Sequence, residues 1–230
     1  MSLAVSLISV LAFAFIFQKP LKHFPVFFYV LTVLICVGVI FLTNYSGPTP
    51  ILIDTILMAF QKAHVGFAFF VFVMYIGVFP KNSRIHAYFL PVRDRLSIIA
   101  GIFIMGHISL FAGNYMGYIS NFFSLRLNTM SSLIIALIML VLLVPLFITS
   151  FTIVRKKMKA RTWDNLQKLA YPFFGLIYLH LLGFLLPSSL AGNLSTLISV
   201  VIYSVIFFLY FALRLMRFFL DRKTSKKKAV

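Results

Sequence analysis

Long apolar runs separated by short polar breaks make up most of this chain of 230 residues. Hydrophobic residues account for 62% of the sequence, and the mean hydropathy is +1.04. A soluble domain of this size cannot bury so much apolar surface, so lipid must surround most of the chain. In lipid, each segment has to satisfy its own backbone hydrogen bonds. The runs therefore predict an all-α integral membrane protein.

Seven of these runs are predicted to form membrane helices. The first, Leu3–Phe17, is short, and we expect a short N-terminal helix. A cleaved signal peptide is the less favoured alternative, because the run lacks a charged segment before it and a convincing small-residue cleavage site after it. The third run, Ile51–Phe79, is long enough to cross a bilayer with tilt. Pro145 predicts a kink in the fifth run, and Pro187 predicts the end of the sixth. The other runs are Val26–Thr43, Leu96–Met116, Ser131–Val154, Leu166–Leu186 and Leu194–Leu213, with loops at 80–95 and 117–130.

Positive charge is distributed unevenly among the connecting segments. The net charge is +17, with 21 lysines and arginines against 4 acidic residues. With seven spans, every basic residue except Lys62 and Arg126 falls on one side of the membrane, which must then be cytoplasmic. The N-terminus is predicted outside and the C-terminus inside, in a cell membrane and most simply a bacterial cytoplasmic membrane. Basic clusters between apolar runs set orientation and contact anionic lipid, so membrane lipid is an expected partner and nucleic acid is not.

Several classes of active site lack the residues that they need. Cys36 is the single cysteine and lies within an apolar run, so neither a disulfide nor a thiolate metal site is expected. An HExxH motif is absent, and the acidic residues all lie outside the deep parts of the spans. These features argue against zinc chemistry, against hydrolysis and against a proton-coupled transporter that uses a membrane carboxylate.

Two histidines lie within apolar runs at similar depth. His107 is near the middle of the fourth run and His180 near the middle of the sixth. Both runs start from the cytoplasmic side, so at 1.5 Å per residue both imidazoles lie roughly 15 Å into the membrane. Two imidazoles at one depth on separate helices match the two axial ligands of a haem iron. The alternative is that each histidine only hydrogen-bonds a neighbouring helix. Glycines beside the histidines are expected to leave room for a flat macrocycle, and they are Gly106, Gly175 and Gly183.

The segment Arg155–Gln167 reads RKKMKARTWDNLQ and is followed by Tyr171 and His180. Together with Arg93–Arg95 and Gly106-His107, it resembles the ferric-reductase-like transmembrane domain family, and most closely the haem b membrane subunits of bacterial methionine sulfoxide reductase systems. The resemblance covers residues 51–215 and implies a six-helix core that holds b-type haem. Residues 1–50 then form two N-terminal helices, the first an addition to that core, and residues 216–230 form a basic cytoplasmic tail.

The resemblance also implies roles for individual residues. His107 and His180 match the axial ligands of the outer haem. Gln167 stands where two-haem members of the family carry the inner ligand histidine, so one haem b is expected and a second is not supported. A flavin or quinone is one candidate for carrying electrons through the cytoplasmic half. The residues expected around it are Arg93, Arg95, Trp163 and Gln167.

His64 and Lys62 are predicted to lie close to the level of the outer haem. His64 would bond a propionate, with Lys62 supplying charge, or would serve as an alternative ligand, and a purely structural role is equally open. The sequence thus predicts a membrane cytochrome b, the electron-transfer subunit of a transmembrane oxidoreductase. A cytoplasmic protein or quinol would donate the electrons, and an extracytoplasmic ferric chelate or flavoprotein or reductase partner would accept them. The alternative from another class is a haem-free polytopic transporter or a structural membrane subunit.

Overall fold

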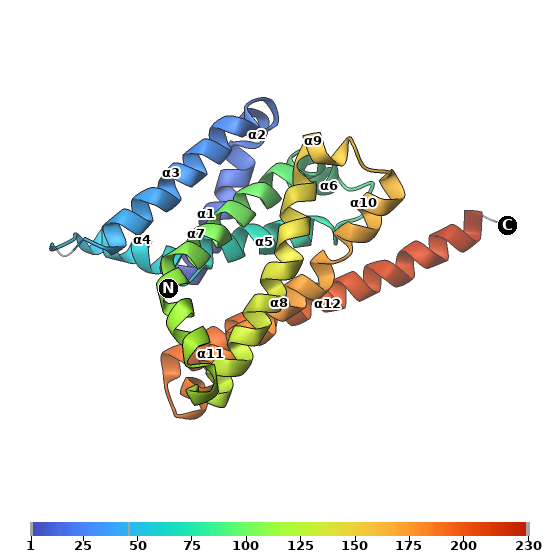
Figure 1. Ribbon diagram of the computed structural model, residues 1–230. Coiled ribbons are helices and arrows are strands. Elements are labelled where there is room, and N and C mark those ends of the chain that lie inside the picture. Colours follow the sequence, from blue (N-terminus) through green and yellow to red (C-terminus); the bar gives the residue numbers. More distant parts are fainter. Residues whose placement is uncertain (1, 46, 229–230) are drawn as a thin grey trace.

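The computed structural model describes residues 2–45 and 47–228, and Figure 1 shows their arrangement. In these two ranges the chain is built of helices and their connections, and no strand is present. The prediction of an all-helical protein is therefore confirmed. The helices are α1 (Ser2–Ile16), α2 (Gln18–His23), α3 (Pro25–Thr43), α4 (Ile51–Gln61), α5 (His64–Ile76), α6 (Arg84–Phe89), α7 (Arg93–Ser120), α8 (Leu127–Ser150), α9 (Thr152–Arg155), α10 (Ala160–Gln167), α11 (Ala170–Leu190) and α12 (Leu194–Lys228), with short 3-10 turns η1 (Leu90–Val92) and η2 (Phe122–Ser124).

Five helical segments of the described chain are long and apolar enough to cross a membrane. The pair α4 and α5 makes a sixth if it is counted as one bent span. α1 has 15 residues, which is shorter than a helix normally needs to cross the hydrocarbon core of about 30 Å. A multi-pass membrane protein is thus supported, with five to six spans by length and composition.

The third apolar run is not one continuous helix, as the sequence predicted. It divides into α4 and α5, whose axes differ by 56°. The break is at Ala63, which has a positive φ of 56° and lies in the left-handed region. The amide of Lys62 still bonds the carbonyl of Met58, and the amide of Phe67 bonds the carbonyl of Ala63, so the backbone changes direction within one residue.

The left-handed conformation of Ala63 is expected to lower the stability of the protein by a measurable amount. An alanine in the left-handed region costs about 1 kcal/mol or more relative to glycine, which adopts that conformation freely. We expect Ala63→Gly to raise the free energy of unfolding by about 0.5–1 kcal/mol. The gain should appear as a higher midpoint of thermal unfolding in detergent. Ala68→Gly, in the middle of α5 and buried, is the matched control and should lower it.

α5 lies at the centre of the molecule. It packs extensively against α7 and α1, while α3 packs on the other face of α7. On its remaining side, Phe67 and Val71 belong to a buried cluster with Phe174 of α11 and Phe207 of α12. The most extensive helix pair is α8 with α11, and α11 also packs against α12. α1 is part of this core, since Val10 and Ala14 are buried against α5.

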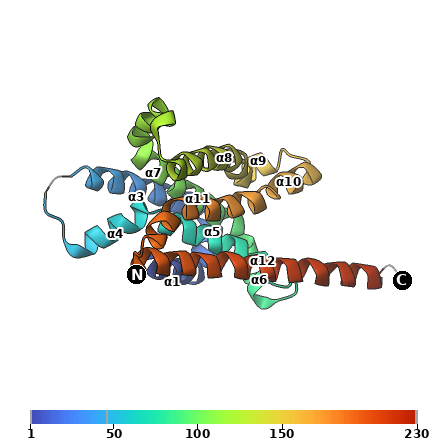
Figure 2. The same cartoon turned by 90° about the horizontal axis from the view of Figure 1, so that it is seen from below.

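The short helices that carry much of the basic sequence gather at one end of the bundle. α2, α6, α9 and α10 lie together there, as Figure 1 shows. Gln18 of α2 donates to the carbonyl of Tyr88 in α6 at 3.0 Å, which joins two of these segments directly. α12 runs out of the bundle toward the C-terminus as one long helix (Figure 2). The predicted basic tail continues this helix to Lys228, and residues 229–230 lie outside the described part.

Several predicted boundaries were wrong because short helices form inside the polar segments. The predicted loop 80–95 contains α6, whose first turn is capped by Ser83 accepting from the amide of His86 at 3.2 Å. The loop 117–130 is largely taken up by the end of α7, by η2 and by the start of α8. Pro187 lies within α11 rather than ending it, and the helix continues to Leu190.

Candidate functional site

His180 is held in one orientation by the neighbouring helix α8. Its Nδ1 lies 3.1 Å from the carbonyl oxygen of Ser132. A carbonyl only accepts, so Nδ1 carries the proton and Nε2 keeps its lone pair. The ring of Phe184, one turn further along α11, packs edge-on against the imidazole with centroids 5.1 Å apart. This arrangement leaves His180 with one nitrogen available as a ligand.

His107 lies on α7 at the break between α4 and α5. Its ring is close to the peptide groups of Phe60 and Gln61, the last residues of α4. Nδ1 is buried and makes no hydrogen bond of acceptable geometry, although neighbouring peptide groups interact with the ring electrostatically. Phe111 covers one side, with ring centroids 5.1 Å apart. A buried polar atom without a partner is uncommon and calls for an explanation such as an absent ligand.

His107 and His180 lie on two helices that pack against the same neighbour, α8. His107 and His180 are near enough to interact electrostatically, although they lie 73 positions apart on different helices. α8 packs against both α7 and α11, whereas α7 and α11 share few direct contacts. Both rings are half-buried. The two histidine-bearing helices are therefore connected through α8 rather than by direct packing on each other. No cluster of three or more histidine, cysteine or acidic side chains that could hold a metal ion occurs among the described residues.

The glycines near the histidines do not leave open space. A Cβ at Gly106 would come within 2.7 Å of the sulfur of Cys36 on α3. At Gly183 an added Cβ would overlap the hydroxyl of Ser132, and its distance to Ser132 Cβ would be 3.2 Å. Gly175 is looser, with Phe211 as its nearest neighbour at 3.7 Å. The first two glycines therefore allow helices to approach closely, and the prediction that they make room for a macrocycle was wrong in this structure.

His64 and Lys62 lie on either side of the break. Lys62 caps the C-terminal end of α4 and is exposed, and His64 is the first residue of α5 and is half-buried. Lys62 acts electrostatically on the His64 ring. Both residues therefore lie at the break between α4 and α5, and His107 lies beside the last peptide groups of α4.

A cavity of about 320 Å³ lies at the end of the bundle where the basic segments gather. Three of the four residues predicted to surround a cytoplasmic cofactor line it: Arg93, Trp163 and Gln167. Arg95 does not line it, because its guanidinium turns to the carbonyl of Pro91 and to Asp94. Sequence reasoning missed the contribution of Arg155, which lines the cavity and stacks over the indole of Trp163 at 4.2 Å. Its place at the start of the basic segment, eight residues before the only tryptophan, was the available signal.

The polar groups in this cavity are tied to the end of α8. Trp163 Nε1 donates to the carbonyl of Thr149 at 3.1 Å, and Gln167 Nε2 donates to the hydroxyl of Thr149 at 3.2 Å. Ser97 of α7 and Ser150 of α8 are also in the lining, with their hydroxyls 3.2 Å apart. No histidine lines the cavity.

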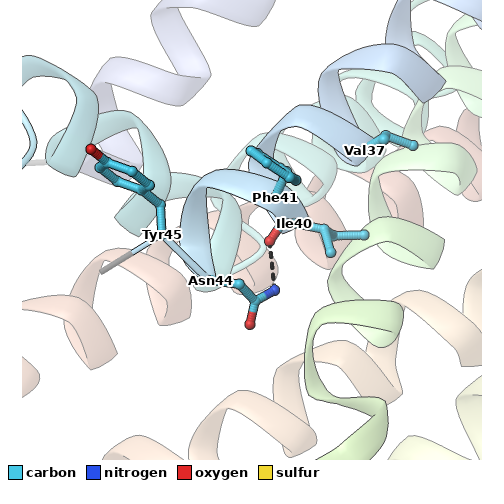
Figure 3. A pocket seen from close by; sticks show the side chains of 5 residues that line it. All are labelled: Val37, Ile40, Phe41, Asn44 and Tyr45. Carbon is cyan, nitrogen blue, oxygen red and sulfur yellow. Dashed lines mark hydrogen bonds between the residues drawn. The ribbon is translucent and has the colours of Figure 1, made fainter. Parts of the chain in front are cut away.

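A second hollow of about 380 Å³ lies at the end of α3 and is shown in Figure 3. Its lining comes from five residues: Val37, Ile40, Phe41, Asn44 and Tyr45. Apart from Tyr45, its polar contribution is the amide of Asn44, which already donates to the carbonyl of Ile40 at 2.8 Å. The hollow is open and apolar, and it includes none of the predicted site residues. It has the character of a lipid-facing groove.

Comparisons with known proteins give one relative and no family. No family model matches the chain, and no solved structure matches it. An uncharacterized protein of Treponema pallidum (strain Nichols) is 30% identical over 226 residues, which is 97% of this chain. The chain spans 62% of the length of that relative. The similarity thus extends over nearly all of the membrane bundle, including its first helices.

Proposed function

We propose that this chain is a membrane cytochrome b in which His107 and His180 bind one b-type haem. The observation that carries the proposal is the pairing of the two imidazoles by separate helices. Nδ1 of His180 is fixed on a carbonyl so that Nε2 points away as a ligand. The carbonyl or carboxylate that orients a ligating histidine is a regular feature of metal sites. The resemblance of the sequence to ferric-reductase-like domains supports the same assignment.

The donor set fits a haem iron better than other metals. Neutral imidazole is a common axial ligand, and two are sufficient for haem, whereas zinc needs further protein ligands. Nδ1 of His107 is buried without a hydrogen bond of normal geometry, although the backbone of Phe60 and Gln61 lies near the ring, and ligation through Nδ1 would satisfy it. When bound, haem supplies one-electron transfer. The chain contributes the two ligands, the Ser132 carbonyl that sets the tautomer of His180, and aromatic cover from Phe111 and Phe184.

In this proposal, electrons enter the protein at the end of the bundle where the basic helices gather. By the distribution of basic residues this end is cytoplasmic, the N-terminus is outside, and α1 counts as a seventh short span. Electrons would come from a cytoplasmic protein or from quinol and leave to an extracytoplasmic ferric chelate or protein partner. His64 and Lys62, at the break beside His107, are placed to interact with a haem propionate. The chain would then be the electron-transfer subunit of a transmembrane oxidoreductase.

The absorption spectrum of the purified protein tests this function. After expression with ample haem supply, we expect a Soret band that shifts on reduction with dithionite and a sharp b-type α band. Pyridine haemochrome measurement should give one haem per chain. A protein that folds as a helical species yet carries no chromophore would instead support the haem-free transporter or structural subunit.

A further inference from the structure

The cavity between α7, α8 and α10 contains an uncompensated positive charge. Arg93 lines it, and the one hydrogen bond its side chain makes in the described structure is from Nε to the carbonyl of Val73 at 3.1 Å. Another cation, Arg214, acts electrostatically on it, and no salt bridge joins Arg93 to a carboxylate in the described part of the chain. Asp94, also in the lining, is engaged by the amide of Arg95 at 2.9 Å and by its guanidinium at 3.3 Å. Two guanidiniums, of Arg93 and Arg155, thus face the cavity without a carboxylate of their own.

The other hydrogen-bond donors that line the cavity already donate to acceptors within the protein. The indole of Trp163 and the amide of Gln167 both donate to Thr149. The Ser150 hydroxyl donates to the carbonyl of Leu146 at 2.8 Å, and that of Ser97 to the carbonyl of Asp94 at 2.7 Å. A flavin ring or a quinone, with several carbonyls that need donors, would find these groups already used. An anion that needs only the guanidiniums would be satisfied.

The rest of the lining is apolar, and the mouth is at the edge of the bundle. Leu143, Phe147 and Phe173 form part of the inner wall. Leu90 and Arg155, which also line the cavity, are exposed, so it opens between η1 and α9. The volume is at the lower end of small-molecule sites, which span roughly 300–1,000 Å³. A ligand with an anionic head and an apolar body matches a cavity that is lined by an exposed arginine at the mouth, a second arginine further in, and aromatic rings.

We propose that this cavity binds one anionic phospholipid, with the phosphate between Arg93 and Arg155 and the first part of an acyl chain against the aromatic wall. Basic pockets between membrane helices on the cytoplasmic side are suited to such headgroups. The lipid occupies the position beside Gln167 at which the resemblance would place an inner haem. The inference is independent of the haem assignment, because neither His107 nor His180 lines the cavity.

Trp163 makes the site directly observable, because it is the single tryptophan of the chain. The full-length protein in a neutral detergent is titrated with dioleoyl phosphatidylglycerol, and tryptophan emission is followed. We expect a saturable change at a low lipid-to-protein ratio and no such change with dioleoyl phosphatidylcholine. Native mass spectrometry of the same samples should show one retained phosphatidylglycerol per chain.

Matched variants separate the site from general surface charge. Arg93→Gln and Arg155→Gln should each raise the half-saturating lipid concentration by about tenfold or more, since each removes a charge-assisted contact. Lys156→Gln removes an adjacent, exposed charge that does not line the cavity, and its titration should match the wild type. Because Arg155 is exposed, its variant is expected to fold even if Arg93→Gln does not.

Three results would overturn the proposal. The first is an equal response to phosphatidylcholine, which would mean that only the apolar wall binds. The second is the same fluorescence change with inorganic phosphate alone, which would mark a free-anion site. The third is a flavin or quinone recovered in equal amount with the purified protein and lost in Arg155→Gln. All readouts work with haem-free protein, so failure of the cytochrome proposal leaves this test intact.

Discussion

Alanine in place of His180 is expected to remove the bound haem altogether. The His180 side chain interacts electrostatically with His107, and its Nδ1 is already used to hold the ring on Ser132. With one of the two proposed ligands removed, haem would be held by His107 alone, too weakly to survive purification, and we expect the purified variant to show no reducible b-type α band. His107→Ala should give the same result. The measurement is haem content per chain from the pyridine haemochrome spectrum.

Gln167→Ala is the matched control on the same stretch of sequence. Gln167 lines the other cavity and donates to Thr149, so its loss should leave haem content and the α band unchanged. Haem retained at wild-type level in either histidine variant would refute the ligand assignment. Loss of haem in Gln167→Ala as well, with unchanged helix content, would move the haem toward the basic end of the bundle.

Valine in place of Gly101 is expected to destabilise the bundle strongly. Gly101 of α7 is buried, and a Cβ there would overlap the ring of Phe147 on α8, at 2.7 Å from Cε2. Phe147 is itself packed edge-on against Phe151, with centroids 5.2 Å apart, so the ring has little room to move. Overpacking of this kind costs about 1–3 kcal/mol. The thermal midpoint in detergent should fall by several degrees.

The same substitution at Gly117 controls for the intrinsic effect of valine in a helix. Gly117 lies on α7 as well, but a Cβ there has nothing within 4 Å. Gly117→Val should therefore leave the midpoint near that of the wild type. Equal midpoints for the two variants would show that α7 and α8 are not packed as closely as Gly101 and Phe147 indicate.

The positions of the main helices were accessible from the sequence because each is a long apolar run. α3 spans Pro25–Thr43, one residue more than the predicted run, and the apolar cores of α7, α8, α11 and α12 lie within the predicted runs. The break at Ala63 was not accessible. Neither glycine nor proline marks it, and the polar residues around it, Gln61, Lys62 and His64, do not by themselves predict a left-handed residue. A left-handed alanine is imposed by tertiary packing of α5, and no local residue preference signals it.

In the candidate site, too, some features could be predicted from the sequence and others could not. The depth argument predicted His107 and His180 at one level, and in the structure the two rings are within range of an electrostatic interaction. The orienting carbonyl of Ser132 could not be predicted, because every residue carries a carbonyl and only the packing of α8 on α11 selects this one. The cavity at the basic end likewise arises from segments distant in sequence, so single residues such as Trp163 were foreseen but the enclosed space was not.

The bend between α4 and α5 has a consequence for the lipid around the protein. At 1.5 Å per residue, α4 is about 16 Å long and α5 about 20 Å, so neither alone covers a hydrocarbon core of about 30 Å. Lys62 lies at the junction and is exposed. A charge at that depth draws headgroups and water toward itself, and a short span thins the bilayer beside it. The membrane next to α4 is therefore expected to be locally thin, and hydrated near the same break that His107 faces.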